Sequence, residues 1–61
     1  MEKLLSVNQL ASILGLKKPT IYEWVRDNKI PFVKLGKRVL FKPSDITDFI
    51  KSNRVEVQNE V

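Results

Sequence analysis

A single glycine, Gly15, separates two short stretches of the chain in which apolar residues recur at helical spacing. The apolar positions are Val7, Leu10, Ala11 and Leu14 before the glycine and Ile21, Trp24 and Val25 after it. Glycine adopts the left-handed conformation that ends a helix at little cost, so Gly15 predicts a tight turn between two helices. Helices of about two or three turns are not stable alone. Their apolar faces must therefore pack against each other and against the rest of the chain.

The ends of both predicted helices carry start and stop signals. Ser6 and Gln9 have the spacing of a capping box at the start of the first helix. Pro19 is favoured in the first turn of the second helix, and Asn28 suits its left-handed end. We expect Leu16, directly after the turn, to fill the angle between the helices. Together these signals predict a helix-turn-helix.

Residues 32–42 change from the helical period to the alternating period of β-strands. Residues 35–38 supply a turn, so this segment predicts a β-hairpin with a basic tip. Two strands alone are marginally stable, and the hairpin must therefore pack on the helices. Alternation puts Leu40 on the outer face, where it either covers an edge of the core or contacts a partner.

A third helix follows the hairpin. Pro43 ends the second strand, and Ser44 is suited to cap the helix. The predicted apolar face consists of Ile46, Phe49 and Ile50. Residues 55–61 show no helical stripe, and are either a frayed tail or an alternating segment that pairs with a neighbouring chain. The predicted fold class is α+β, a small winged helix-turn-helix in the order α-α-β-β-α over residues 1–54, with residues 55–61 as a flexible tail.

Positive charge is concentrated in the middle of the chain, which has a net charge of +4. Residues 17–42 contain only Glu23 and Asp27 as acidic side chains. The basic side chains of the same segment are Lys17, Lys18, Arg26, Lys29, Lys34, Lys37, Arg38 and Lys42. Such a block indicates one positive face, which either binds nucleic acid or keeps the protein in solution.

Several classes of function are disfavoured by what the sequence lacks. The chain has no histidine and no cysteine, which removes the usual zinc ligands and the commonest general base. It has no glycine-rich phosphate loop, and no apolar run approaches the ~18 residues of a membrane span or fits a signal peptide. We expect a cytoplasmic protein that is not an enzyme and uses no metal or cofactor.

The start of the second helix is unusual because lysines stand where helices ordinarily carry acidic or hydroxyl side chains. Lys17 and Lys18 cost the helix about 0.3–1 kcal/mol at low salt, and a DNA phosphate would relieve that cost. Lys18, Tyr22 and Arg26 are spaced four apart, and we expect Thr20 to continue their exposed face.

Each of these side chains has chemistry that suits DNA. Arg26 can read a base with two hydrogen bonds or clamp a phosphate, and the hydroxyls of Thr20 and Tyr22 can bond phosphate. Tyr22 can also contact a thymine methyl, while Glu23 either accepts from a cytosine amino group or faces solvent. Trp24 lies in register with Ile21 and is better explained by core packing. In the predicted wing, Lys34, Lys37 and Arg38 would reach phosphates or the minor groove.

Residues 4–50 resemble the excisionase-type, MerR-like winged-helix family. The matching segments are LSVxxLAxxLGL, TIYxWV, IPxxKLGKR and FxxSDIxxFI, in that order. Members are small DNA-binding proteins of bacteria, phages and mobile elements, of which some bend DNA and direct a tyrosine recombinase toward excision and others regulate transcription. The resemblance implies DNA contacts at Lys17, Lys18, Thr20, Tyr22 and Arg26 and at Lys37 and Arg38 of the wing.

Two departures and one missing part qualify the resemblance. Lys18-Pro19 stands where the family often has serine, and Leu40 stands where it often has a basic or polar residue. The coiled coil and effector domain of full MerR regulators are missing, so no small-molecule effector is expected. The leading hypothesis is an excisionase-like protein that binds double-stranded DNA, in several cooperating copies, beside an integrase. The alternatives are a small transcriptional regulator and, in a different class, a protein-protein adaptor that uses Leu40 and residues 55–61.

Overall fold

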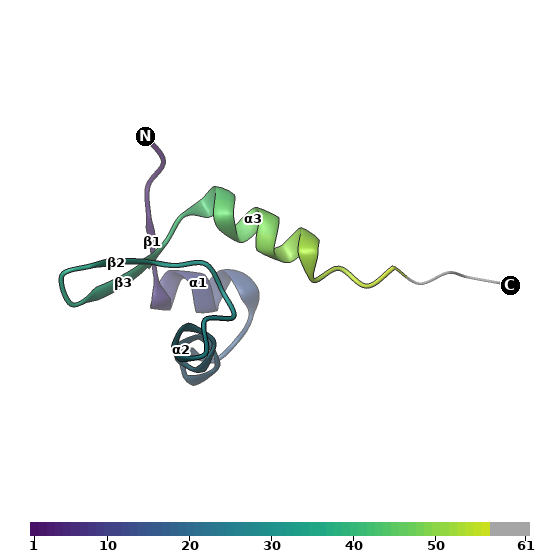
Figure 1. Cartoon of the computed structure of the whole chain (residues 1–61), viewed down its shortest axis with the longest axis horizontal. Coiled ribbons are helices and arrows are strands. Elements are labelled where there is room, and N and C mark those ends of the chain that lie inside the picture. Colours follow the sequence, from purple (N-terminus) through teal and green to yellow (C-terminus); the bar gives the residue numbers. More distant parts are fainter. Residues whose placement is uncertain (57–61) are drawn as a thin grey trace, which may run out of the picture.

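The computed structural model describes residues 1–56. In it, a three-stranded antiparallel sheet brings a strand near the N-terminus beside the hairpin. The elements are β1 (Leu5–Ser6), α1 (Val7–Leu14), α2 (Lys18–Arg26), β2 (Val33–Leu35), β3 (Arg38–Phe41) and α3 (Pro43–Ser52) (Figure 1). The predicted α+β winged helix-turn-helix is confirmed, with one strand more than expected. The strand order is β1-β3-β2, so the short β1 makes β3 the central strand of the sheet.

Local hydrogen bonds define both ends of α1. The backbone N–H of Gln9 donates to Ser6 Oγ at 3.1 Å, and the Ser6 N–H donates to Gln9 Oε1 at 2.9 Å, which confirms the capping box. Gly15 has a φ of 68°, and the N–H of Leu16 donates to the Ala11 carbonyl at 3.0 Å. This left-handed closure is the Schellman arrangement that allows a sharp turn into α2.

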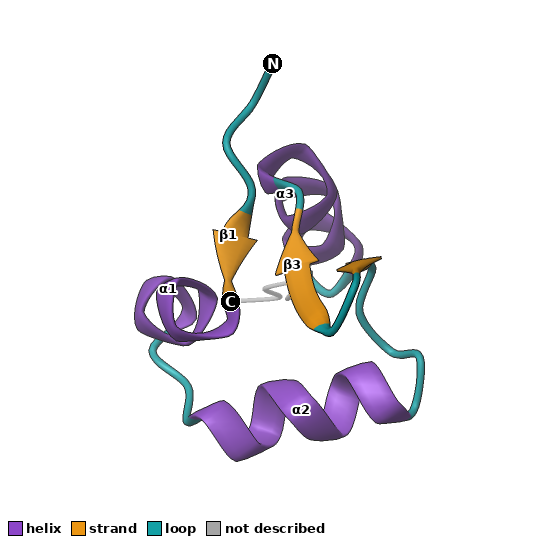
Figure 2. Ribbon diagram, turned by 90° about the vertical axis from the view of Figure 1, so that its left-hand side faces the viewer, coloured by secondary structure: helices purple, strands orange, loops and turns teal. Residues whose placement is uncertain are grey.

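The second helix ends in the same way, but on an asparagine. Asn28 has a φ of 55°, and the N–H of Lys29 donates to the Trp24 carbonyl at 2.8 Å. The predicted left-handed end at Asn28 is therefore confirmed. The chain then reverses and rises from the end of α2 to β2, on the side of the sheet away from α1 (Figure 2).

One residue from each of three elements is fully buried, and together they form the centre of the core: Leu10 of α1, Ile21 of α2 and Phe41 of β3. The other buried side chains are Val7, Ala11, Ile30 and Ile46. Ile30 was not predicted, because it lies in the loop between α2 and β2 and belongs to no periodic stretch. Trp24 is half-buried against this core, and its ring lies 5.7 Å from that of Phe49 on α3.

Two predicted core positions are wrong. Leu16 is 37% exposed and does not fill the angle between the helices. Ile50 is 49% exposed, because Ile46 and Phe49 already cover the side of α3 that meets the core. Leu40 pairs with Ser6 and Val33 and is half-buried, while its neighbours Val39 and Phe41 pack on the core. The predicted alternation of β3 is therefore confirmed.

The prediction that Ser44 caps α3 is wrong. The start of this helix is capped by a residue near the N-terminus of the chain. Pro43 occupies the first helical position and Lys42 the cap position, which places Ser44 two residues too late to be the cap. Instead, the carboxylate of Glu2 accepts hydrogen bonds from the Ser44 N–H at 3.0 Å and from Ser44 Oγ at 2.9 Å. These bonds from Ser44, with a smaller effect of nearby Lys42, lower the pKa of Glu2.

Glu2→Ala should lower the melting temperature at pH 7, and this difference should become smaller at pH 3. A carboxyl whose pKa is lower in the folded state stabilises the fold above its unfolded pKa, and this contribution is lost as pH falls through the folded pKa. Thermal unfolding by circular dichroism at both pH values measures the difference. Glu56→Ala removes the same charge outside all helices and strands and should melt like the wild type. Equal melting temperatures for Glu2→Ala and wild type at pH 7 would show that the contact adds no stability.

The predicted C-terminal tail comprises residues 55–61. Residues 57–61 lie outside the part of the chain that the structure describes. Val55 and Glu56 are exposed and belong to no helix or strand. Within the described part of the chain, no helix is long and apolar enough to cross a membrane.

Candidate nucleic-acid interface

The N-terminus of α2 is an exposed, basic helix end without a side-chain cap. Lys17 is the extended residue before the helix and its side chain makes no capping hydrogen bond. Lys17 and Lys18 are both exposed, and the first turn contains Pro19, which has no N–H to donate. An anion at this helix end would meet two ammonium groups and the positive end of the helix dipole.

The exposed side of α2 holds most of the predicted contact residues. Lys18, Tyr22 and Arg26 are exposed and lie along one side, with Tyr22 54% accessible. Glu23 is exposed beside them. The prediction for Thr20 is wrong in its placement, because Thr20 is half-buried and lies about 200° around the helix from Tyr22. Thr20 is therefore on the same flank as Trp24 and away from Lys18, Tyr22 and Arg26.

Arg26 is partly engaged by its neighbour in the chain. Its Nε donates to Asp27 Oδ1 at 3.2 Å, and this hydrogen bond raises the pKa of Arg26. The charge of Glu23 raises the pKa of Arg26 only to a smaller extent. The Arg26 side chain is 71% exposed, so the ion pair is weak, and the two Nη groups are left to donate elsewhere.

The β2–β3 hairpin forms the wing, with exposed Lys34 on β2 and exposed Lys37 and Arg38 at its tip. Gly36 has a φ of 61°, which permits the tight turn. Figure 2 shows the wing above α2, and Lys37 and Arg38 of its tip line the same pocket as Tyr22 of α2. The C-terminal end of α3 lies at the opposite end of the domain from the wing tip (Figure 1).

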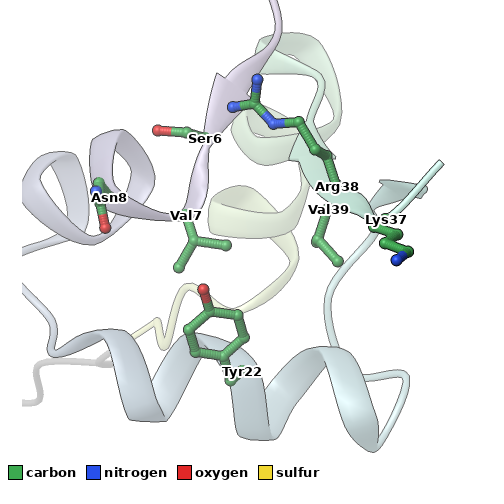
Figure 3. A pocket seen from close by; sticks show the side chains of 7 residues that line it. All are labelled: Ser6, Val7, Asn8, Tyr22, Lys37, Arg38 and Val39. Atoms are coloured by element: carbon green, nitrogen blue, oxygen red, sulfur yellow. The ribbon is translucent and has the colours of Figure 1, made fainter. Parts of the chain in front are cut away.

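A polar pocket of about 290 Å³ lies where α1, α2 and the wing meet. Tyr22 rises from α2 with its hydroxyl directed toward Val7, and the Arg38 guanidinium extends from the wing toward Ser6 (Figure 3). Asn8, on the first turn of α1, and Lys37 also line the pocket. Neither Ser6 nor Asn8 was predicted as a site residue, because Ser6 is explained by capping and Asn8 has no pattern around it.

A second, apolar groove of about 450 Å³ lies on another flank of the domain. Trp24, two positions from Tyr22 and hence about 200° around α2, forms part of its wall. The other apolar walls are Leu14, Leu16, Phe49 and Ile50, and Lys51 and Arg54 lie at its edge. Leu16 and Ile50, the two predicted core residues that are exposed, both line this groove. Among the described residues, no group of acidic side chains could hold a metal ion.

The fold and this basic side define a class of protein. A helix-turn-helix with an exposed basic second helix and a basic hairpin beside it is a winged DNA-binding domain. A family model described as a helix-turn-helix domain matches residues 4–54, and the chain belongs to this family. Neither the comparison with curated proteins nor that with solved structures gives a significant match. The protein is thus a small DNA-binding helix-turn-helix protein.

Proposed function

We propose that the protein is an excisionase-like recombination directionality factor, which binds and bends double-stranded DNA to help a tyrosine recombinase assemble. The observation that supports this most directly is that Tyr22 on the exposed side of α2 lines one pocket together with Lys37 and Arg38 of the wing tip. Lys17, Lys18, Tyr22, Glu23 and Arg26 would enter or border the major groove. Lys34, Lys37 and Arg38 would follow the adjacent backbone and minor groove. The excision role itself rests on the resemblance of residues 4–50 to excisionases.

The second candidate is a small transcriptional regulator, which would use the same contacts at a promoter. A single module of this size reads a short sequence, so either role gains specificity if several copies bind neighbouring sites. The apolar groove beside Trp24 is the feature that favours a protein-protein adaptor instead. Leu40, the residue that the sequence suggests for that role, is half-buried within the sheet and offers less surface.

Selection from a pool of random duplexes, followed by footprinting of the matching genomic sites, distinguishes these roles. Sites at the end of a mobile element beside an integrase gene, with bent DNA in a circular-permutation gel, are expected for an excisionase. Sites over promoters would indicate the regulator. Enrichment of no sequence, together with binding that does not depend on salt, would contradict DNA binding and favour the adaptor.

Arg26→Ala should weaken binding to the selected site about tenfold to hundredfold and leave the fold intact. The side chain is exposed, and its one hydrogen bond among the described contacts is to the adjacent Asp27, so its removal opens no cavity. Gel-shift titration and thermal unfolding of the same samples measure both effects. Arg26→Lys keeps the charge without the planar fork and separates the two roles: a phosphate clamp tolerates it, whereas a base reader loses discrimination at one position. Unchanged affinity and specificity in Arg26→Ala would exclude both roles.

A further inference from the structure

The polar pocket between α1, α2 and the wing lies where a DNA backbone must run if the protein binds as a winged helix. A recognition helix in the major groove and a wing in the neighbouring minor groove are separated by one sugar-phosphate strand. That strand has to cross the surface between α2 and β2–β3. The pocket lies on this surface, with Tyr22 on one side and Lys37 and Arg38 on the other (Figure 3).

The lining of the pocket is suited to an anion. Arg38 and Lys37 supply positive charge, Tyr22 supplies a hydroxyl donor, and no acidic side chain lines the pocket. Ser6 Oγ accepts a hydrogen bond from the Gln9 N–H, so its own proton remains available to a further acceptor. The side-chain amide of Asn8 adds two more donors on the first turn of α1.

The position of Asn8 is fixed by the capping box rather than by a flexible loop. Ser6 and Gln9 are bonded to each other in both directions, and Asn8 lies between them in the chain. Ser6 belongs to β1, which pairs with β3, the strand that begins with Arg38. The backbone positions of Asn8 and Arg38 are therefore held relative to each other by the sheet before any ligand arrives.

We propose that this pocket seats one phosphate of the DNA backbone, with Asn8, Tyr22 and Arg38 as its donors. The proposal rests on the proposed DNA binding and makes α1 a part of the interface. The seated phosphate would set how far α2 enters the major groove, because it fixes the strand between the helix and the wing.

Single methylphosphonate substitutions along the selected duplex test the proposal with the full chain. Each substitution makes one phosphate neutral. For the wild type, one position between the major-groove and minor-groove footprints should cost about tenfold in affinity, as expected for the loss of charge-assisted hydrogen bonds. Tyr22→Phe and Asn8→Ala should each bind the natural duplex several-fold more weakly than the wild type does. A methylphosphonate at that one position should then lower the affinity of either variant only a little further. At other phosphates, both variants should lose as much as the wild type.

The controls separate failure of the pocket from failure of DNA binding. Ser12→Ala changes an exposed side chain of α1 that does not line the pocket and should behave like the wild type at every position. Thermal unfolding checks that all variants are folded. If the duplex is bound specifically but Tyr22→Phe and Asn8→Ala lose as much as the wild type at every phosphate, the pocket holds no phosphate and the proposed function stands. If no sequence is selected and no duplex is bound, both proposals are wrong.

Discussion

Phe41→Ala should lower the free energy of unfolding by about 3–5 kcal/mol, the usual cost of removing a buried aromatic ring. Phe41 is fully buried and lies on the central strand, where it pairs with Leu5 across the sheet. A domain of 61 residues has roughly 3–9 kcal/mol of stability in total, and no disulfide supports this one. The substitution should therefore remove between about a third and all of this stability, and the unfolding midpoint should fall sharply. Urea denaturation followed by circular dichroism measures the change.

Phe32→Ala provides the matched comparison. Phe32 carries the same ring but is only half-buried at the margin of the core, so its loss should cost clearly less. Phe41→Leu, which keeps most of the volume, should lie between the wild type and Phe41→Ala. Unfolding midpoints that are the same for Phe41→Ala and Phe32→Ala would contradict the central role of Phe41 in this core.

Local signals were sufficient to predict the helices and the wing, because each is defined within a few residues. The capping box at Ser6, the left-handed ends at Gly15 and Asn28, and the change to alternation after residue 32 all have their partners nearby in the chain. Periodicity alone overestimated the core. It assigned Ile50 to a buried face, although how many side chains of a helix are covered depends on what packs against it. Leu16 was expected to be buried only because it follows the turn, and it too is exposed.

Contacts between distant parts of the chain could not be predicted in this way. The two residues of β1 are too short to show alternation, and Ser6 already had an explanation as a cap. The bond from Ser44 to Glu2 joins positions 42 residues apart, so neither end shows its partner in the local sequence. The same limit applies to the site: Lys37 and Arg38 were identified by their charge, whereas Asn8 became a candidate only when α1 and the wing were seen to share a pocket with Tyr22.

The double variant Lys37→Ala/Arg38→Ala should weaken DNA binding by roughly two orders of magnitude at 0.1 M salt and flatten its salt dependence. Each phosphate that a basic side chain neutralises contributes about 0.9 to the slope of log affinity against log salt. Loss of both wing contacts should therefore reduce the slope by about 1.8. Fluorescence anisotropy with a fixed duplex between about 50 and 200 mM salt measures the slope and the affinity together.

This experiment asks whether the position of the two basic side chains matters, or only the net charge of the protein. The chain offers a control variant with the same loss of charge. Lys51→Ala/Arg54→Ala also removes one lysine and one arginine and also lowers the net charge from +4 to +2. These two side chains are exposed at the end of the domain opposite the wing tip (Figure 1). Only the long-range field should change in this control, and over such a distance salt screens most of it. If the two double variants lost equal affinity and equal slope, DNA would be held by the overall charge of the protein. A loss of affinity and slope that is confined to the wing variant would mean that the wing contacts the DNA backbone, as a winged helix requires.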